Sequence, residues 1–313
     1  MSSAGDPGAG DDFQRYLRAK RTVDDRAIDR RVFDRLREEL AGRESLRVLD
    51  VGAGLGASLR RFLARDALPD RVEYVLVDRD GATLAAARET LPARAGELGY
   101  EASKDESPDG GVLLSRDDER VRVEFVRGDA LAVASDRERE YDLLVGQAFL
   151  DLVDPAALSD LLSCLRAGGL WYFPITYDGG TRFAPAHPLD DAVERAYHAH
   201  MDAQPKAGSA AGRAVFGALP DRAAVLAAAG SDWVVYPRDR GYPDDEAYFL
   251  RYVLDTVAGA VGERATDPNA TDGGAAALDP DALDDWLATR RGQVEAGELT
   301  YVAHQLDLLG RVE

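Results

Sequence analysis

Short apolar runs of strand length alternate with segments of helical periodicity along most of the chain. The strand-like runs lie at 48–51, 74–78, 121–126, 141–145, 170–173, 232–236 and 299–305. Segments with apolar residues three or four positions apart lie at 58–66, 80–97, 155–165, 189–201, 220–230, 246–261 and 283–294. This alternation is typical of a mostly parallel sheet covered by helices on both faces. We therefore predict an α/β fold with a doubly wound, seven-stranded, mostly parallel sheet.

Three segments lie outside this alternation. Residues 1–12 are acidic and rich in glycine, so we predict a disordered tail. Residues 13–44 are predicted to form a helical cap, in which the capping sequence Thr22–Asp25 starts a second helix. Residues 178–212 follow the fifth strand, at the edge of such a sheet that binds ligands, so we predict an insertion or lid. Residues 13–313 are predicted to form one domain.

Two polar stretches are predicted to connect these elements. Residues 101–120 form either a surface loop or, if 112–115 pairs with 121–125, a β-hairpin. Residues 262–278 are of low complexity and are predicted to be a loop.

Composition restricts the class of protein. Hydrophobic residues make up 45% of the 313 residues, enough for a sizeable core, and no apolar run approaches a membrane span of about 20 residues. The first twelve residues lack the apolar core of a signal peptide. Cys164 is the only cysteine, which excludes an internal disulfide and a cysteine-based zinc site. We therefore expect a cytoplasmic protein without a metal centre.

The charge balance is strongly acidic. Asp and Glu number 57 against 38 Lys and Arg, giving a formal net charge of -19, and the only lysines are Lys20, Lys104 and Lys206. Such a surface is typical of halophilic proteins, in which salt screens the self-repulsion, and we favour a halophilic archaeon over a genome rich in GC. Acidity also argues against a nucleic-acid partner, although less strongly in a halophile.

A glycine-rich turn follows the first strand. Gly52, Gly54 and Gly56 come directly after the apolar run 48–51 and before a helical segment. Such a turn lets a ligand approach the backbone closely, and Gly52, Gly54 and Ala57 also fit the dinucleotide fingerprint. Asp50 argues against a dinucleotide, because a carboxylate near the helix N-terminus would repel a pyrophosphate. A cofactor with an amino group and a sulfonium would tolerate it.

Five segments together resemble the class I S-adenosylmethionine-dependent methyltransferases. Val48–Gly56 resembles motif I of that family, and Tyr74–Asp78 resembles its second strand ending in an acid. The third, fourth and fifth strands are matched by Val121–Leu131, Tyr141–Gln147 and Leu165–Phe173. The resemblance covers about residues 20–178 by motif, and 220–313 by strand order only.

The resemblance implies S-adenosyl-L-methionine as cofactor and a last strand that runs antiparallel. The positions that it places around the cofactor are Asp50, Gly52, Ala53, Gly54, Gly56, Asp78, Arg79, Gly128, Asp129, Ala130 and Gln147. Asp78 would bind the ribose, Asp129 the adenine, and Gln147 would stand beside the methyl group. Lys20, Arg21 and Arg26 either bind the cofactor carboxylate or form a solvated basic face.

Candidates for the transfer itself lie after the fourth and fifth strands. They are Gln147, Phe149, Tyr177, Asp178 and His187. Tyr177 would orient the acceptor and Asp178 would bind an amine or accept a proton, unless Tyr177 packs and Asp178 caps the following glycine turn. His187 is the candidate base among the histidines. His198 and His200 are two residues apart on a helix and point to different faces, so they cannot chelate a metal together.

Sequence motifs that would identify the acceptor are absent. The Asn-Pro-Pro-Tyr type of motif used on base amino groups is missing after the fourth strand, where Gln147–Leu150 stands, and no Pro-Cys pair exists. We therefore predict methyl transfer to a small-molecule acceptor. Two alternatives remain open at this point: an NAD-dependent oxidoreductase, and a non-catalytic subunit with a methyltransferase fold.

Overall fold

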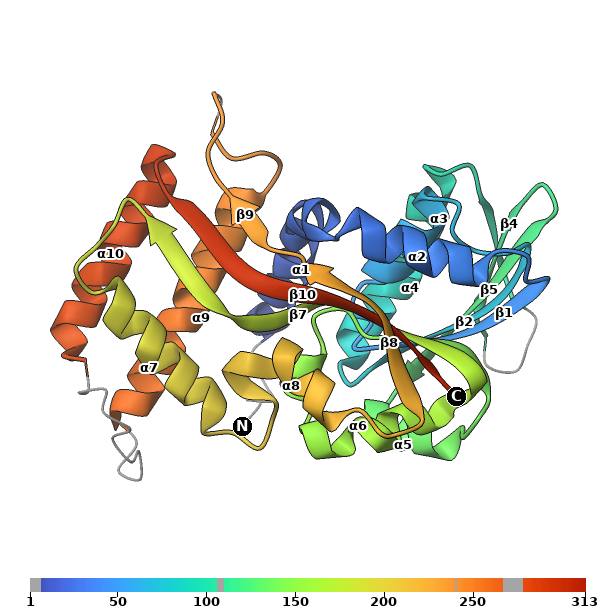
Figure 1. The fold of residues 1–313 in the computed structure, drawn as a ribbon. Coiled ribbons are helices and arrows are strands. Elements are labelled where there is room, and N and C mark those ends of the chain that lie inside the picture. Colours follow the sequence, from blue (N-terminus) through green and yellow to red (C-terminus); the bar gives the residue numbers. More distant parts are fainter. Residues whose placement is uncertain (1–6, 106–109, 240, 267–277) are drawn as a thin grey trace.

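The computed structural model describes residues 7–105, 110–239, 241–266 and 278–313, and Figure 1 shows their arrangement. The strands are β1 (Ser45–Val51), β2 (Arg71–Asp78), β3 (Glu101–Lys104), β4 (Val112–Arg116), β5 (Glu119–Arg127), β6 (Tyr141–Val145), β7 (Leu165–Ala184), β8 (Ala223–Gly230), β9 (Trp233–Val235) and β10 (Thr300–Val312). The α-helices are α1 (Pro7–Ala27), α2 (Arg30–Leu40), α3 (Ala57–Ala64), α4 (Gly81–Gly96), α5 (Ala130–Asp136), α6 (Leu158–Leu161), α7 (Asp190–Asp202), α8 (Ala211–Ala218), α9 (Glu246–Thr266) and α10 (Pro280–Ala296). The 3₁₀ helices are η1 (Leu150–Leu152), η2 (Pro155–Ala157), η3 (Leu162–Cys164) and η4 (Gly208–Ala210).

The strands form one sheet in the order β3-β4-β5-β2-β1-β6-β7-β10-β8, and β9 pairs with the far end of β10. Strands β5, β2, β1, β6 and β7 are parallel, whereas β10 runs antiparallel between β7 and β8. This order confirms the predicted doubly wound, mostly parallel sheet and its reversed last strand. The described residues contain ten strands rather than seven, because β3 and β4 extend the sheet beyond β5, and β8, which was predicted as a helix, pairs with β10.

Helices cover both faces of the sheet, as a doubly wound fold requires. On one face, α2, α3 and α4 pack on side chains such as Leu46, Tyr74 and Leu143, and α1 joins the same hydrophobic cluster. On the other face, α5, α6 and α8 pack against Leu49 and other residues of the second cluster. The alternation along each strand therefore divides the core into two layers, and the turns between strands and helices lie at one edge of the sheet.

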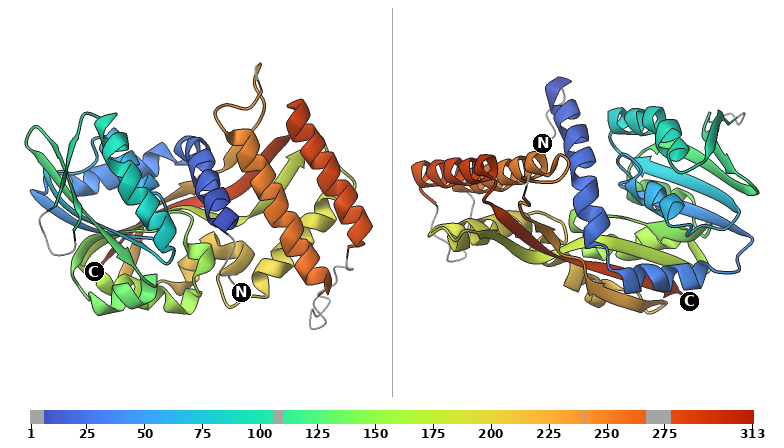
Figure 2. Two further views of the ribbon diagram at one scale, coloured as in Figure 1. Left: turned by 180° about the vertical axis from the view of Figure 1, so that it is seen from behind. Right: turned by 90° about the horizontal axis from the view of Figure 1, so that it is seen from above.

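Strands β7 and β10 continue well beyond the sheet as a paired ribbon (Figure 1). Their pairing runs from Leu170 opposite Arg311 to Ala184 opposite Thr300, with irregularities next to His304 and Asp307. Helices α7, α9 and α10 pack around the far part of this ribbon, which Figure 2 shows from behind and from above. We call α7, α9, α10 and the ribbon beyond Tyr177 the helical lobe. Its hydrophobic residues belong to the same cluster as α2 and α3.

Several predicted boundaries differ from the structure. Residues 220–230, predicted as a helix, form strand β8, because pairing with β10 overrides the helical preference of an alanine-rich segment. Helix α1 begins at Pro7 and continues through 22–25, so the proposed capping sequence starts no helix. The second helix instead begins after Asp29, whose carboxylate accepts hydrogen bonds from the backbone of Arg31 and Val32.

The predicted boundaries of the insertion and of the loops also differ from the structure. The fifth strand extends to Ala184, so the segment 178–212 starts inside a strand and then forms α7 and part of α8. Of the two alternatives for 101–120, the hairpin is confirmed: β4 pairs antiparallel with β5. Of the predicted loop 262–278, residues 262–266 continue α9, and 267–277 lie outside the described residues. The predicted tail is helical from Pro7, and residues 1–6 also lie outside them.

Candidate functional site

The glycine turn after β1 has the conformation that its sequence predicts. Gly52, Gly54 and Gly56 have φ values of 61°, 53° and 76°, in the left-handed region that side chains disfavour. A Cβ atom at Gly52 would lie 2.6 Å from Cδ2 of Phe149, so the ring of Phe149 fills the space that a side chain would need. Gly56 then precedes the first turn of α3. The turn therefore requires glycine at position 52 both for backbone conformation and for space.

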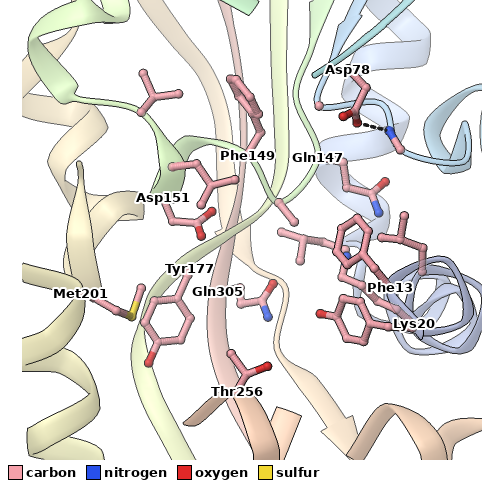
Figure 3. A pocket seen from close by; sticks show the side chains of 18 of the residues that line it. Phe13, Lys20, Asp78, Gln147, Phe149, Asp151, Tyr177, Met201, Thr256 and Gln305 are labelled. Atoms are coloured by element: carbon pink, nitrogen blue, oxygen red, sulfur yellow. Dashed lines mark hydrogen bonds between the residues drawn. The ribbon is translucent and has the colours of Figure 1, made fainter. Parts of the chain in front are cut away.

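A cavity of about 610 Å³ opens between this turn, α1 and the helical lobe (Figure 3). Its volume falls within the range of small-molecule sites. One part of its wall comes from the ends of parallel strands and contains Gly52, Gly54, Asp78, Arg79, Gly128, Asp129, Ala130, Leu131 and Gln147. We call this part the strand-end half. The remaining wall, which we call the lobe half, comes from α1, the segment after β6, the ribbon, and helices α7 and α9.

Asp78 connects the glycine turn to the next strand of the sheet. One of its carboxylate oxygens accepts a hydrogen bond from the backbone of Gly54 at 2.9 Å, and the other accepts one from the backbone of Asp80 at 2.9 Å. Figure 3 shows the first of these bonds and the carboxylate at the cavity wall. A carboxylate has about four acceptor positions, so Asp78 can also accept hydrogen bonds from two ligand hydroxyls.

Asp129 and Arg79 form the outer rim of the strand-end half. Asp129 caps α5 by accepting hydrogen bonds from the backbone of Leu131 and Ala132, and its second oxygen pairs with Arg79. The hydrogen bond from Arg79 is the main cause that lowers the pKa of Asp129. Arg79 is largely exposed, so this pair closes the rim from outside.

Some residues predicted for the cofactor do not reach the cavity wall. Asp50 is 1% exposed and points into the sheet layer, where it accepts a hydrogen bond of 2.8 Å from the hydroxyl of Tyr74. Burial raises the pKa of Asp50 to about 7. Ala53 and Gly56 shape the turn but do not line the cavity. Asp50 is therefore too deep to repel a pyrophosphate by direct contact, contrary to the expectation from sequence.

Gln147 lines the cavity, but both ends of its amide are held by the protein. Its nitrogen donates to Asp24 at 2.7 Å, and its oxygen accepts from Arg61 at 2.7 Å. Asp24 also accepts hydrogen bonds from Lys20 at 2.6 Å and from the Trp233 indole at 2.9 Å. Gln147 thus joins the end of β6 to α1 and α3, and it is a positioning residue in this geometry rather than a free catalytic amide.

The basic residues of α1 have separate partners. Lys20 is buried and lines the cavity, Arg21 lies 3.8 Å from Asp25, and Arg26 binds Glu246 of α9. Arg26 therefore tethers α1 to α9, and neither it nor Arg21 is at the cavity wall. Only Lys20 retains the predicted position beside a ligand.

The candidates from the fifth strand and the insertion are divided between two places. Tyr177 lines the cavity, and its hydroxyl lies 2.9 Å from the hydroxyl of Thr181 and 2.7 Å from Nε2 of His198. Burial raises the pKa of Tyr177 above its usual range. Asp178 points to the opposite side of the ribbon, where it binds the backbone and the guanidinium of Arg213.

Asp178 therefore lines a second, shallower cleft with His198 and His304, away from the transfer point. His187 lies at the start of α7, where its backbone donates to Asp190 and its Nδ1 accepts from Leu189. Neither Asp178 nor His187 lines the main cavity, contrary to expectation. Asp178 lies on the other side of the ribbon because side chains alternate along a strand, and His187 lies beyond the end of β7, just before α7.

Sequence reasoning missed most of the lobe half. It contains Asp151, Gln305, Thr256, Met201 and several aromatic residues, and together these come from segments far apart in the sequence. Figure 3 shows Asp151, Tyr177 and Gln305 around the same space, with Phe149 on the side of the glycine turn. Gln305 lies directly opposite Tyr177 on the paired strand, which the register of β10 could have indicated if the length of β7 had been known.

Backbone strain is concentrated where the two halves meet. Ala148 and Ile175 have φ values of 49° and 58°, which is rare for residues other than glycine and most unfavourable for a branched side chain such as Ile175. Both residues line the cavity. The backbone of Ala148 donates to the carbonyl of Pro174, and that of Ile175 donates to the buried carboxylate of Asp307 at 2.8 Å. Such strain is a frequent property of functional sites.

Two further properties concern metals and membranes. Among the described residues, no group of three or more His, Cys, Asp or Glu side chains is arranged to hold a metal ion. Within the same residues, no helix is both long and apolar enough to cross a membrane.

Comparisons with known proteins give similarity in structure alone. No family model matches the chain, and no curated protein matches it in sequence. The chain is similar to the structure of a SAM-dependent methyltransferase from Geobacter sulfurreducens in complex with S-adenosyl-L-homocysteine, with 18% identity, a TM-score of 0.44 and 92% of each chain covered. For a SAM-dependent methyltransferase from Thiobacillus denitrificans in the same complex, the identity is 17%, the TM-score 0.43, and the coverage 92% of this chain and 93% of that chain.

The cyclopropane synthase MmaA2 from Mycobacterium tuberculosis is also similar, with 11% identity, a TM-score of 0.39, and 89% of this chain and 82% of that chain covered. At these identities and scores, the activities of those proteins do not transfer to this chain. Its function has to be argued from its own cavity and sheet.

Proposed function

We propose that this protein is a class I S-adenosylmethionine-dependent methyltransferase that acts on a small-molecule acceptor. The observation that carries the proposal is the combination of Asp78 and the glycine turn at one wall of a cavity that continues into the lobe half. The strand order supports it, since a dinucleotide fold has the parallel order 3-2-1-4-5-6, whereas here the antiparallel β10 lies between β7 and β8.

The strand-end half fits S-adenosylmethionine better than a dinucleotide. Gly52 and Gly54 allow the ligand to approach the backbone, and Asp78 has acceptor positions left for the two ribose hydroxyls. Asp78 and Asp129 both lie along this wall, so a pyrophosphate would meet two carboxylates. Lys20 lines the cavity and would bind the carboxylate of the methionine part of the cofactor.

The cofactor supplies a methyl group on a positively charged sulfur, which is already a good electrophile. The protein then has mainly to align the acceptor and to exclude water. Gln147 and Phe149 lie between the two halves of the cavity, where they would fix this alignment. Residues of α1 and α9 line the lobe half, and a cavity of this size suits an acceptor smaller than a macromolecule.

The test is calorimetric titration of S-adenosylmethionine, S-adenosylhomocysteine and NAD into the full chain in molar KCl. We expect micromolar binding of the first two and none of NAD. Binding of NAD alone would support the oxidoreductase instead. No detectable binding of any of the three ligands, with the fold intact, would support a non-catalytic subunit. Either result would overturn the proposal.

A variant tests the role of Asp78. We expect Asp78→Ala to weaken S-adenosylhomocysteine binding by about 10- to 100-fold, because hydrogen bonds to a charged group are each worth about 1.5–3 kcal/mol. Asp34→Ala on α2 is the matched control, since its carboxylate is largely exposed and does not line the cavity. Circular dichroism checks that both variants fold. Unchanged affinity in Asp78→Ala would show that this carboxylate does not bind the ribose.

A further inference from the structure

The lobe half contains a carboxylate, Asp151, that has no side-chain hydrogen bond and no direct ion pair among the described residues, although Lys20 and Lys206 lie near enough to act on its charge. Asp151 lies in the segment after β6. The other carboxylates at the cavity wall have partners: Asp78 and Asp154 accept from backbone amides, and Asp129 also pairs with Arg79. Figure 3 shows the carboxylate of Asp151 directed into the open space.

Gln305 gives a second and independent sign of a ligand. It is 2% exposed, and its Oε1 has no hydrogen-bond partner in the structure. A buried amide oxygen without a donor costs about 1–3 kcal/mol, so such an atom is normally satisfied by water or by a ligand. Its side chain faces the same space as Asp151 from the opposite wall, as Figure 3 shows. Both groups are acceptors, so what lies between them has to donate.

Aromatic rings form much of the wall around these two acceptors. They come from Tyr16, Tyr177, Tyr197, Trp233, Tyr252 and Tyr301. Electron-rich ring faces attract cations, and the attraction grows when water is excluded. Several rings are fixed by neighbours: Tyr16 stacks on Tyr252 with a centroid distance of 4.2 Å, and Trp233 meets Phe249 edge to face at 5.3 Å. The wall is therefore preorganised rather than free to collapse.

The cations at the cavity wall do not favour an anionic acceptor. Among the described residues that line the cavity, the only ones are Lys20, which pairs with Asp24 and is the residue proposed for the cofactor carboxylate, and Arg79, which pairs with Asp129 at the outer rim. An acceptor that carries a carboxylate or a phosphate beside Asp151 would meet a like charge, and no cation described at the cavity wall is free to pair with it.

We propose that the methyl acceptor is a small primary or secondary amine, held through its nitrogen between Asp151 and Oε1 of Gln305 within this aromatic wall. This inference rests on the proposed methyltransferase function and adds the substrate class. Asp151 and Gln305 act as catalytic residues in it, since both touch the reacting nitrogen.

The transfer then balances as follows. The amine enters as an ammonium ion, and Asp151 takes one N–H proton, which frees the nitrogen lone pair. That lone pair forms a bond to the methyl carbon while the carbon–sulfur bond breaks, and the sulfur keeps the electron pair of that bond. The products are a methylated ammonium ion, a neutral thioether and a protonated Asp151, which returns its proton to water after release. Burial raises the pKa of Asp151, which makes it a more effective base.

The first experiment measures binding without turnover. The full chain, saturated with S-adenosylhomocysteine in molar KCl, is titrated with butylamine, butanol and butyrate, and then with benzylamine, benzyl alcohol and benzoate. We expect the amine to bind at least about tenfold more tightly than the alcohol and the carboxylate in one series or both. Preference for the carboxylate or the alcohol, or binding of no amine, would overturn the inference.

Variants link the preference to the named atoms. Asp151→Asn keeps the shape of the side chain and removes its charge, and we expect it to weaken amine binding at least about tenfold while S-adenosylhomocysteine binding stays within about twofold. Asp160→Asn, an exposed position on α6, is the control and should match the parent protein in both. Gln305→Leu should weaken amine binding through loss of the acceptor. Amine affinity unchanged in both Asp151→Asn and Gln305→Leu would overturn the inference.

A second experiment identifies the product class directly. The protein and methyl-labelled S-adenosylmethionine are incubated with a small-molecule cell extract, and the products are separated on a cation exchanger. Labelled product retained as a cation supports the amine. Labelled product only in the neutral or anionic fractions overturns it but leaves the methyltransferase function standing. Loss of S-adenosylhomocysteine binding in the first titration would instead overturn the proposed function, so the two failures are distinguishable.

Discussion

At the scale of single residues, Asp50 carries an unfavourable charge. It is fully buried below the glycine turn, with the Tyr74 hydroxyl as its hydrogen-bond donor and Asp78 and Arg61 as the charged groups nearby. Burial raises its pKa to about 7, well above the value of about 4 in an unfolded chain. Between these two pH values the folded protein binds more protons than the unfolded chain does. Stability should therefore fall as pH rises through that range.

Substitution of Asp50 isolates this effect. We expect Asp50→Asn to be close to the parent protein in stability at pH 4 and more stable by pH 8, with a difference of up to about 4 kcal/mol, because each tenfold difference in proton affinity between the folded and unfolded chains corresponds to about 1.4 kcal/mol. Urea unfolding at pH 4, 5, 6, 7 and 8 measures it. Asp307, whose pKa burial raises to about 6, is present in both proteins and cancels in the comparison. A difference that does not grow with pH would show that Asp50 ionises freely.

At the scale of elements, the docking of α1 decides whether the cavity has a wall on that side. The helix is tied to α9 by Arg26 and Glu246, and to the end of β6 and to β9 through Asp24. Asp24 and its partner Lys20 are both nearly fully buried. Removing one partner of such a pair leaves an uncompensated charge, which typically costs about 3–5 kcal/mol.

We expect Asp24→Ala to lower the free energy of unfolding by about 3–5 kcal/mol, and the double variant Asp24→Ala with Lys20→Met to recover part of that loss. Urea unfolding of the parent, the two single variants and the double variant gives the coupling energy. A loss below about 1 kcal/mol in Asp24→Ala would mean that Lys20 reaches water in the variant and that Asp24 is not needed to hold α1.

The elements that could be predicted from sequence are those whose signal is local. Strand, glycine turn and helix follow each other within about twenty residues from Ser45 to Ala64, and α3 overlaps the predicted segment 58–66 except at its ends. The prediction of a helix at 220–230 was wrong because the alanines there favour a helix locally, whereas the strand that pairs with this segment, β10, is about eighty residues away. The predicted length of β7 was too short for the same reason, since residues 174–184 are extended only because β10 pairs with them.

The residues of the candidate site also separate into those that local sequence predicts and those that depend on distant segments. Gly52, Gly54, Asp78 and Asp129 directly follow strands, so their meeting at one sheet edge follows from the topology. Asp151 and Gln305 meet across a lobe assembled from distant segments, and no periodicity or motif marks them.

At the scale of the whole molecule, the formal net charge of -19 acts on every part of the surface. Self-repulsion at this density destabilises a compact state in dilute salt, because exposed carboxylates outnumber the arginines that pair with them. Many arginines are already in ion pairs, including Arg47 with Glu73 and Arg291 with Asp255, so the excess is carried by the remaining acids.

We expect the melting temperature to rise by about 10 °C between 0.1 and 2 M KCl, with most of the rise below 1 M, where the screening length falls from about 10 Å to about 3 Å. Thermal unfolding followed by circular dichroism across a KCl series measures it. A rise that is small below 1 M and continues linearly above it would indicate general salting-out. In that case the acidic composition would not be an adaptation to salt.

The ribbon of β7 and β10 has a mechanical consequence. Two hydrogen-bonded strands resist stretching along their length but twist more easily. The ribbon therefore connects the helical lobe to the sheet through a link that is stiff along its axis and flexible in torsion (Figure 1). We expect a few degrees of rotation about the ribbon axis to move α7 and α9 relative to the cavity while the glycine turn stays in place. The register of the ribbon shifts next to His304 and Asp307, and the pair of Arg26 on α1 with Glu246 on α9 would oppose such a rotation.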